Sequence, residues 1–80
     1  MDKLDRLIEQ FNDLRGNDAD NGYYLTANRH GNIVQIRDTS SLLMTVGYGG
    51  LEIYGLVEFL DRDETILVGK MVEECIEINK

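Results

Sequence analysis

The stretch YYLTANRHGNIVQIR, residues 23–37, decides the fold class because it has the form of a β-hairpin. Apolar side chains alternate with other residues on both sides of RHG, at Tyr23, Leu25, Ala27, Val34 and Ile36. A period of two is typical of strands that bury one face, and a glycine beside His30 suits the tip of a tight turn. We therefore predict two antiparallel strands, YYLTAN and NIVQIR, with His30 and Gly31 at the turn.

A third strand is predicted shortly after the hairpin. The sequence DTS has turn-forming residues, and LLMTVGY, residues 42–48, is apolar at the alternate positions Leu42, Met44, Val46 and Tyr48. The three strands then form an antiparallel meander with one apolar face. The other face is expected to be mixed and open to a partner, with Tyr24, Thr26, Asn28, Ile33, Gln35 and Arg37.

A helix is predicted before the sheet. Apolar residues fall on one stripe at helical spacing, at Leu4, Leu7, Ile8, Phe11 and Leu14. Asp2 can cap the start and Gly16 stands where a helix would end, so the pattern predicts a helix over residues 3–15.

The last third of the chain is ambiguous. Helical spacing recurs twice, which favours two helices near 51–60 and 64–78, with Asp63 as the cap of the second. The same first segment also alternates, at Leu51, Ile53, Gly55, Val57 and Phe59. One kinked helix, or a fourth strand followed by a helix, therefore remains open beside the two-helix interpretation.

The order of elements indicates one α+β domain over residues 1–80. It consists of an N-terminal helix, a three-stranded antiparallel meander and one or two C-terminal helices, all packed on one face of the sheet. A chain this short buries roughly 60 to 65% of its unfolded surface, so a deep substrate cleft is not expected.

A glycine cluster follows the third strand in MTVGYGGLEIYG, residues 44–55, which is the order in which many phosphate-binding loops are built. However, Glu52 stands where the dinucleotide fingerprint needs glycine, and Leu56 and Val57 stand where a P-loop needs Lys and Ser or Thr. We expect a permissive strand-to-helix turn rather than a nucleotide site. Ligand contact there would fall to Tyr48, Gly49 and Gly50.

Catalytic and metal-binding patterns are equally incomplete. NDADNG resembles the start of a calcium loop, but Tyr23 and Arg29 occupy the positions that need glycine and a bidentate Glu. His30 is the single histidine, and Cys75 lies on the apolar stripe of the last helix, where a thiol behaves as a small hydrophobe. We therefore predict no metal, no cofactor and no enzymatic activity.

The charge pattern bears on the partner. The net charge is −7, and it is concentrated at the two ends of the chain: residues 1–20 carry six acids and three bases, residues 51–80 eight acids and three bases. Such a surface repels phosphate backbones and anionic lipids, so a basic protein partner is favoured over nucleic acid or a membrane. The single cysteine, with no signal peptide or membrane span in the N-terminal sequence, predicts a cytoplasmic protein.

Two surfaces are candidates for binding. The first is acidic: Glu73, Glu74 and Glu77 recur with Lys70 at helical spacing opposite the apolar stripe, and Glu58, Asp61, Asp63 and Glu64 form a second cluster. The second is the hairpin, where Arg29, His30 and Arg37 form a basic patch beside Tyr24. Tyrosine and arginine are common in binding hot spots.

The helix-strand-strand-strand-helix order is similar to that of double-stranded RNA-binding domains. That family has a basic cluster at the start of its last helix, and this chain departs from it with Glu52, or with Asp63 and Glu64. In size, acidity and α+β build, the chain also resembles small phage-encoded inhibitors of bacterial defence, including anti-CRISPR proteins. That resemblance implies an inhibitor whose carboxylates imitate phosphates in a basic groove.

We therefore expect a non-enzymatic binding or inhibitory protein that occupies a basic surface of a protein partner. One alternative is a homo-oligomer that binds a phosphate-bearing small molecule between the glycine loop and a neighbouring hairpin. A small structural or assembly component is the other alternative.

Overall fold

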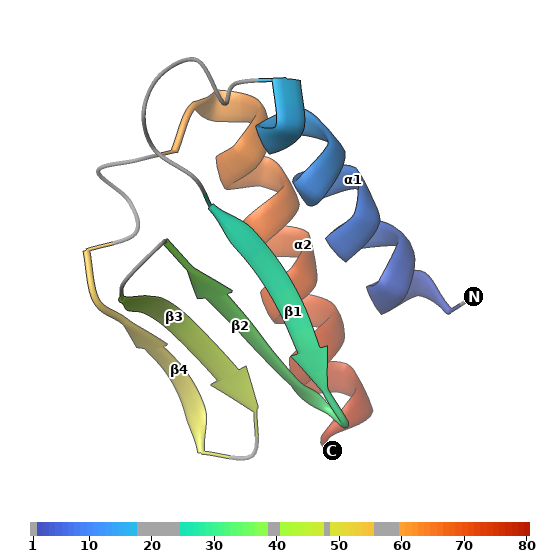
Figure 1. Cartoon of the computed structure of the whole chain (residues 1–80). Coiled ribbons are helices and arrows are strands. Elements are labelled where there is room, and N and C mark those ends of the chain that lie inside the picture. The colour runs from blue at the N-terminus through green and yellow to red at the C-terminus, as the bar shows by residue number, and fades with distance from the viewer. Residues whose placement is uncertain (1, 18–24, 39–40, 48, 56–59) are drawn as a thin grey trace.

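A computed structural model describes residues 2–17, 25–38, 41–47, 49–55 and 60–80 of the 80-residue chain (Figure 1). Its elements, in order, are α1 (Lys3–Asn17), β1 (Thr26–His30), β2 (Ile33–Arg37), β3 (Leu42–Gly47), β4 (Gly50–Ile53) and α2 (Arg62–Ile78). The strands form one four-stranded antiparallel sheet in the order β1-β2-β3-β4. Both helices lie on the same face of the sheet (Figure 1). The predicted α+β class is confirmed, with one strand more than expected.

Helix α1 begins where the sequence predicts. The backbone N–H of Asp5 donates to Asp2 Oδ1 at 2.9 Å, which satisfies one of the free amides in the first turn. The predicted stripe faces the core at Leu4 and Phe11, which are almost completely buried, but its last member, Leu14, is 37% exposed. The helix ends at Asn17, two residues beyond the predicted end.

The hairpin is also confirmed. His30 pairs with Ile33, which leaves Gly31 and Asn32 as a two-residue turn. Gly31 has a φ of 63°, and no described residue other than glycine has a positive φ. A positive φ at the first central position alone is the type II′ arrangement, which matches the right-handed twist of the strands.

Strand β3 contains an irregularity that changes its burial pattern. Ile36 pairs with Met44, whereas the next residue, Arg37, pairs with Leu42, so Leu43 is an extra residue in β3. Both Leu43 and Met44 are buried as a result. Such a bulge explains why strict alternation fails at this one point of the sheet.

The predicted helix over residues 51–60 is wrong where it can be compared, because Gly50–Ile53 is strand β4; residues 56–59 lie outside the described residues. The glycine cluster joins two strands rather than a strand and a helix: Gly47 pairs with Gly50, and Gly50 has a φ of 96°. The period of the apolar residues could not decide between a helix and a strand for this short segment. Pairing with β3 decides for the strand.

Helix α2 matches the second predicted helix, but its cap is Asp61 and not Asp63. Asp61 Oδ1 accepts from Glu64 N–H at 2.9 Å, and Glu64 Oε1 accepts from Asp61 N–H at 2.9 Å. This reciprocal pair is a capping box, and the D-x-x-E spacing in the sequence is its signature. Glu64, predicted as part of an exposed acidic cluster, is instead 1% exposed.

The core lies between the helices and the sheet. Helix α1 packs beside β1, and α2 packs beside β2 and β3. The largest fully buried side chains of the core include Phe11, Met44 and Met71. The opposite face of the sheet carries the described residues predicted for it, Thr26, Asn28, Ile33, Gln35 and Arg37, none of which is buried. Tyr24 lies outside the described residues.

Candidate functional site

The predicted acidic face of α2 borders a groove between the two helices. The groove is lined from both sides by Lys3, Arg6, Leu7, Gln10, Lys70, Glu73, Glu74 and Glu77. Its charged side chains are three cations and three carboxylates. The sequence pattern predicts one exposed face for the three carboxylates, but Glu74 is largely covered, and the pattern did not reveal that α1 brings Lys3 and Arg6 beside them.

The three carboxylates of this face differ in their surroundings. Glu74 is only 22% exposed at its side chain and lies 3.6 Å from Lys3 Nζ. Glu77 lies 3.2 Å from Lys80 Nζ, with both side chains about two thirds exposed at 66% and 69%. Exposed ion pairs of this kind contribute roughly 0–1 kcal/mol, so Glu77 keeps most of its freedom to meet another cation. Glu73 is exposed as well.

The second predicted acidic cluster is divided by the fold. Asp61 is exposed, but one of its oxygens serves as the helix cap, and Glu64 is buried beneath it. Asp63 is exposed in the first turn of α2, and Glu58 lies outside the described residues. Of this cluster, Asp61 and Asp63 therefore remain accessible to a partner.

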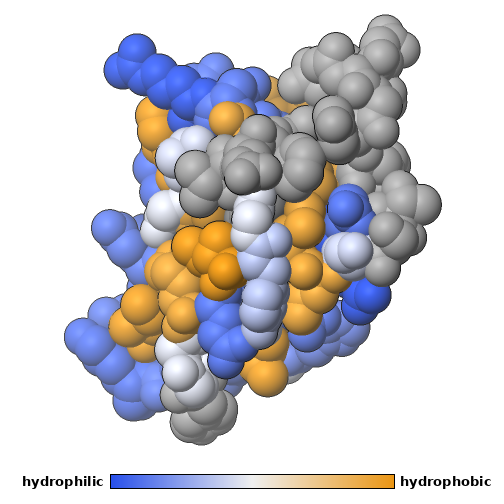
Figure 2. Space-filling view, turned by 90° about the vertical axis from the view of Figure 1, so that its left-hand side faces the viewer, coloured by the Kyte–Doolittle hydropathy of each residue, from blue (hydrophilic) through white to orange (hydrophobic). Residues whose placement is uncertain are grey.

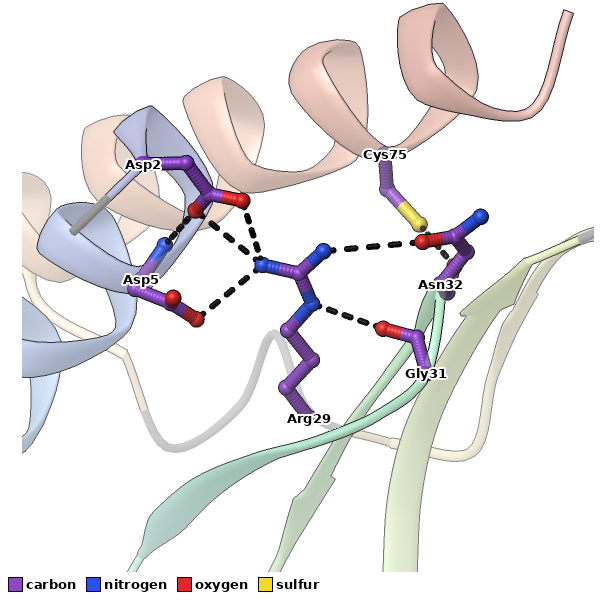
Figure 3. A network of polar contacts seen from close by, with 6 residues as sticks. All are labelled: Asp2, Asp5, Arg29, Gly31, Asn32 and Cys75. Carbon is purple, nitrogen blue, oxygen red and sulfur yellow. Dashed lines mark hydrogen bonds and ion pairs between the residues drawn. The ribbon is translucent and has the colours of Figure 1, made fainter.

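Arg29, predicted as part of a basic patch, forms ion pairs within the chain (Figure 3). Its Nη1 lies 2.8 Å from Asp2 Oδ2 and 3.1 Å from Asp5 Oδ1, and its Nε donates to Gly31 O at 2.7 Å. The hydrogen bond from Arg29 holds the pKa of the Asp2 carboxyl below its ordinary value, and the two carboxylates raise the pKa of Arg29. This Arg29 cluster joins the start of α1 to the end of β1.

The remaining hairpin residues lie at opposite ends of the sheet. His30 is exposed beside the β1–β2 turn, and Gly49 and Gly50 are exposed at the β3–β4 turn, which lies at the same end of the meander (Figure 1). Arg37 is exposed at the other end of β2. The structure thus places the glycine turn at the same end of the sheet as His30, and Arg37 at the other end. Tyr48 lies outside the described residues.

Cys75 is confirmed as a core thiol. It is completely buried, and its Sγ donates to Asn32 O at 3.1 Å and lies 3.4 Å from Val46 O. Asn79 Nδ2 donates to the same Asn32 oxygen at 2.9 Å, so the end of α2 holds the β1–β2 turn in place. Burial raises the pKa of the Cys75 thiol, which keeps it protonated and weakly nucleophilic.

Sequence reasoning missed Asn12, which forms a second link between α1 and β1. Its Oδ1 accepts from Ala27 N–H at 2.8 Å, and its Nδ2 donates to Ala27 O at 3.0 Å. The side-chain amide therefore bonds both backbone groups that Ala27 turns away from β2. No local signal predicts this contact, because the two residues are 15 positions apart in the chain.

Within the described ranges, no group of three or more His, Cys, Asp or Glu side chains is placed to hold a metal ion. None of the described helices combines the length and apolar character needed to cross a bilayer. Comparisons of the chain with protein-family models, curated proteins and solved structures give no significant match.

Proposed function

We propose that the protein is a non-enzymatic binding protein that inhibits a protein partner by occupying a basic surface on it. The observation that carries this proposal is the separation of charge between the two layers. The helical segments 2–17 and 61–80 carry ten acidic and six basic residues, whereas the sheet segment 25–54 carries two of each. The negative charge is thus concentrated on one side of the molecule.

Helix α2 is the most suitable part of that side for a basic partner. Asp63, Glu73 and Glu77 are exposed along it, and its last turn contains no basic residue. The negative end of the helix dipole therefore adds to the charge of Glu77. Clustered charge of one sign steers an oppositely charged partner and raises its association rate.

The surroundings of the reactive side chains support a role without catalysis. Cys75 is buried and protonated, Arg29 is bound to two carboxylates, and His30 is exposed at a turn. The chemistry of binding is also that of the phage anti-defence inhibitors which the chain resembles in type. A free buried thiol suits a reducing compartment, and we propose a cytoplasmic location on that basis.

The test compares two matched charge reversals. One variant carries Glu73→Lys and Glu77→Lys on α2, and the other carries Glu9→Lys and Asp13→Lys on α1; all four residues are exposed, and each pair has the same i, i+4 spacing. A partner captured from nuclease-treated lysate is identified and purified, and its dissociation constant is measured for each variant. We expect a weakening of at least about tenfold for the α2 variant, since each close charge pair contributes 1 kcal/mol or more.

If the α1 and α2 variants weakened binding to the partner equally, net charge and not the α2 face would govern binding. Capture from untreated lysate that disappears in the nuclease-treated lysate would identify nucleic acid as the true partner. Circular dichroism of both variants is the control for folding. Binding that neither reversal changes contradicts the proposal.

Among the alternatives, the ligand-binding oligomer is less well supported, because Asp2 and Asp5 occupy the Arg29 guanidinium that a phosphate would need. The assembly component is favoured by one observation: among the residues that the structure describes, the outer edge of β4 pairs with no other strand.

A further inference from the structure

The outer edge of β4 offers backbone hydrogen bonds to another strand. Within the described residues, β4 pairs with β3 alone. Tyr54 N–H donates to Leu43 O at 2.7 Å, so Tyr54 faces β3. Because successive residues of an antiparallel strand face opposite sides, Leu51 and Ile53 direct their N–H and C=O groups outward.

The side chains at this edge are apolar but poorly covered. Leu51 and Ile53 pair with Val46 and Met44 and therefore point to the helical side of the sheet. Val46 and Met44 are 0% exposed, whereas Leu51 and Ile53 are 43% and 48% exposed. The reason is that α2 packs on β2 and β3, and neither helix packs extensively on β4.

Helix α2 continues this apolar surface. Met71 and Cys75 point to the sheet, and Lys70 and Glu74 border the groove with α1. The helical repeat places Val72 and Ile76 on the side away from α1, towards β4, and Ile76 is 46% exposed. Figure 2 faces this edge of the molecule and shows hydrophobic atoms beside the outer strand.

The other edge of the sheet is satisfied at Ala27 by the chain itself. Asn12 bonds both outward groups of Ala27, and α1 packs along β1. Two copies that pair through the same edge form a closed pair and not a continuous fibre, because each copy uses that edge once. Pairing of β4 with β4 therefore ends at two copies.

We propose that β4 pairs antiparallel with β4 of a second copy of this chain, about a two-fold axis at Ile53. The two four-stranded sheets then become one continuous sheet with all helices on one face. Leu51, Ile53 and Ile76 of both copies meet in the trough between the two α2 helices. Their burial provides the hydrophobic contribution to association.

The register follows from the one charged residue of β4. If Leu51 paired with Ile53 of the second copy, Glu52 would face Glu52, and like charges directly opposite are unfavourable. If Leu51 paired with Leu51, Glu52 would face Gly50 and Ile53 would face Gly49 in the turn, so the pairing would run into the β3–β4 turn; pairing at Ile53 instead leaves Leu51 opposite Gly55, beyond the end of β4. Pairing at Ile53 places Glu52 opposite Tyr54, whose hydroxyl already donates to the Glu52 carboxylate within one chain. The strand is thus complementary to itself.

Charge also favours a second copy at this edge. Glu52 is the single charged residue in segment 49–55 of a chain with a net charge of −7, so little like charge meets when two copies approach at this edge. The strand also lacks the lysine that commonly protects exposed edges from pairing.

The test uses two substitutions of equal exposure. Ile53 and Ile66 are both 48% exposed, but Ile66 lies on α2 away from the sheet edge. We expect the full-length wild type to form dimers in sedimentation equilibrium. Ile53→Lys places like charges opposite each other and should raise the dimer dissociation constant by at least about 100-fold, whereas Ile66→Lys should leave it unchanged.

A second variant keeps the test decisive if Ile53→Lys does not fold. Ile53→Pro removes an N–H that faces away from β3, a position where an edge strand tolerates proline, and should also abolish dimers. Hydrogen exchange provides an independent measurement: the Leu51 and Ile53 amides should exchange more slowly as protein concentration rises, while the Ala27 amide should not change. A wild type that stays monomeric at millimolar concentration, or dimers that survive both Ile53 variants, overturns the proposal.

Discussion

The two edges of the sheet solve the same physical problem in different ways. Each edge strand turns backbone N–H and C=O groups away from the sheet. At β1 the side chain of Asn12 on α1 satisfies those of Ala27, and the ion pairs of the Arg29 cluster lie beside it. At β4 no described side chain bonds the outward groups of Leu51 and Ile53. Tertiary contacts therefore decide whether an edge is closed, because the two strands do not differ in backbone chemistry.

The largest effect on stability is expected when the contact between Asn12 and β1 is removed. Asn12→Ala removes both hydrogen bonds to Ala27, a residue that is 1% exposed, and leaves its backbone groups without a partner. We expect the free energy of unfolding to fall by about 2–3 kcal/mol, because each unsatisfied buried group costs 1 kcal/mol or more. Urea denaturation at low protein concentration measures it.

Asn28→Ala is the control for this variant, since Asn28 is exposed on the outer face of the same strand. It should change stability by less than about 0.5 kcal/mol. An equal loss in both variants would mean that side-chain propensity in β1, and not closure of the edge, explains the effect of Asn12.

A smaller loss of stability is expected from substitutions in the β3–β4 turn, which precedes β4. Gly50 has a φ of 96°, and Gly49 does not have a positive φ, while an added Cβ would meet no atom within 4 Å at either position. Gly50→Ala should therefore cost about 1–2 kcal/mol through backbone strain alone, and Gly49→Ala should be close to neutral. Thermal unfolding of the two variants checks this difference, and equal stability of both would contradict the assigned turn.

The smallest change in stability is expected from the ion pairs of the Arg29 cluster, and the size of this change depends on pH. The pKa of the Asp2 carboxyl is lowered from 3.8 in the folded chain, so its pair with Arg29 stabilises the fold above pH 3.8. That contribution is lost as the pH falls below this value and the carboxyl is protonated. Arg29→Met should accordingly lower the Tm at neutral pH, and the difference from wild type should shrink below about pH 4.

Arg37→Met serves as the control, because Arg37 is exposed on the adjacent strand and takes no part in the Arg29 cluster. Its Tm difference from wild type should not change over the same pH range. A difference for Arg29→Met that persists unchanged in acid would show that the side chain acts through packing and not through Asp2.

Sequence patterns predicted most of the layered fold and part of the candidate surfaces. The stripes of α1 and α2, the hairpin turn and the buried position of Cys75 follow from the repeat of apolar residues, which reports a local conformation. The same patterns failed for the surface residues whose neighbours come from elsewhere in the chain. Arg29 was expected to be free, but it binds carboxylates that lie 24 and 27 positions away.

What the sequence determined by itself is therefore the set of local elements and the face that each one buries, since a period of 2 or 3.6 depends on neighbours along the chain. Only the tertiary structure decided that residues 50–53 form a strand and that Asn12 bonds the outward groups of Ala27, while no other described strand pairs with β4. Backbone hydrogen bonds between strands and contacts between layers join distant segments. Their partners are chosen by three-dimensional packing, which no local pattern records.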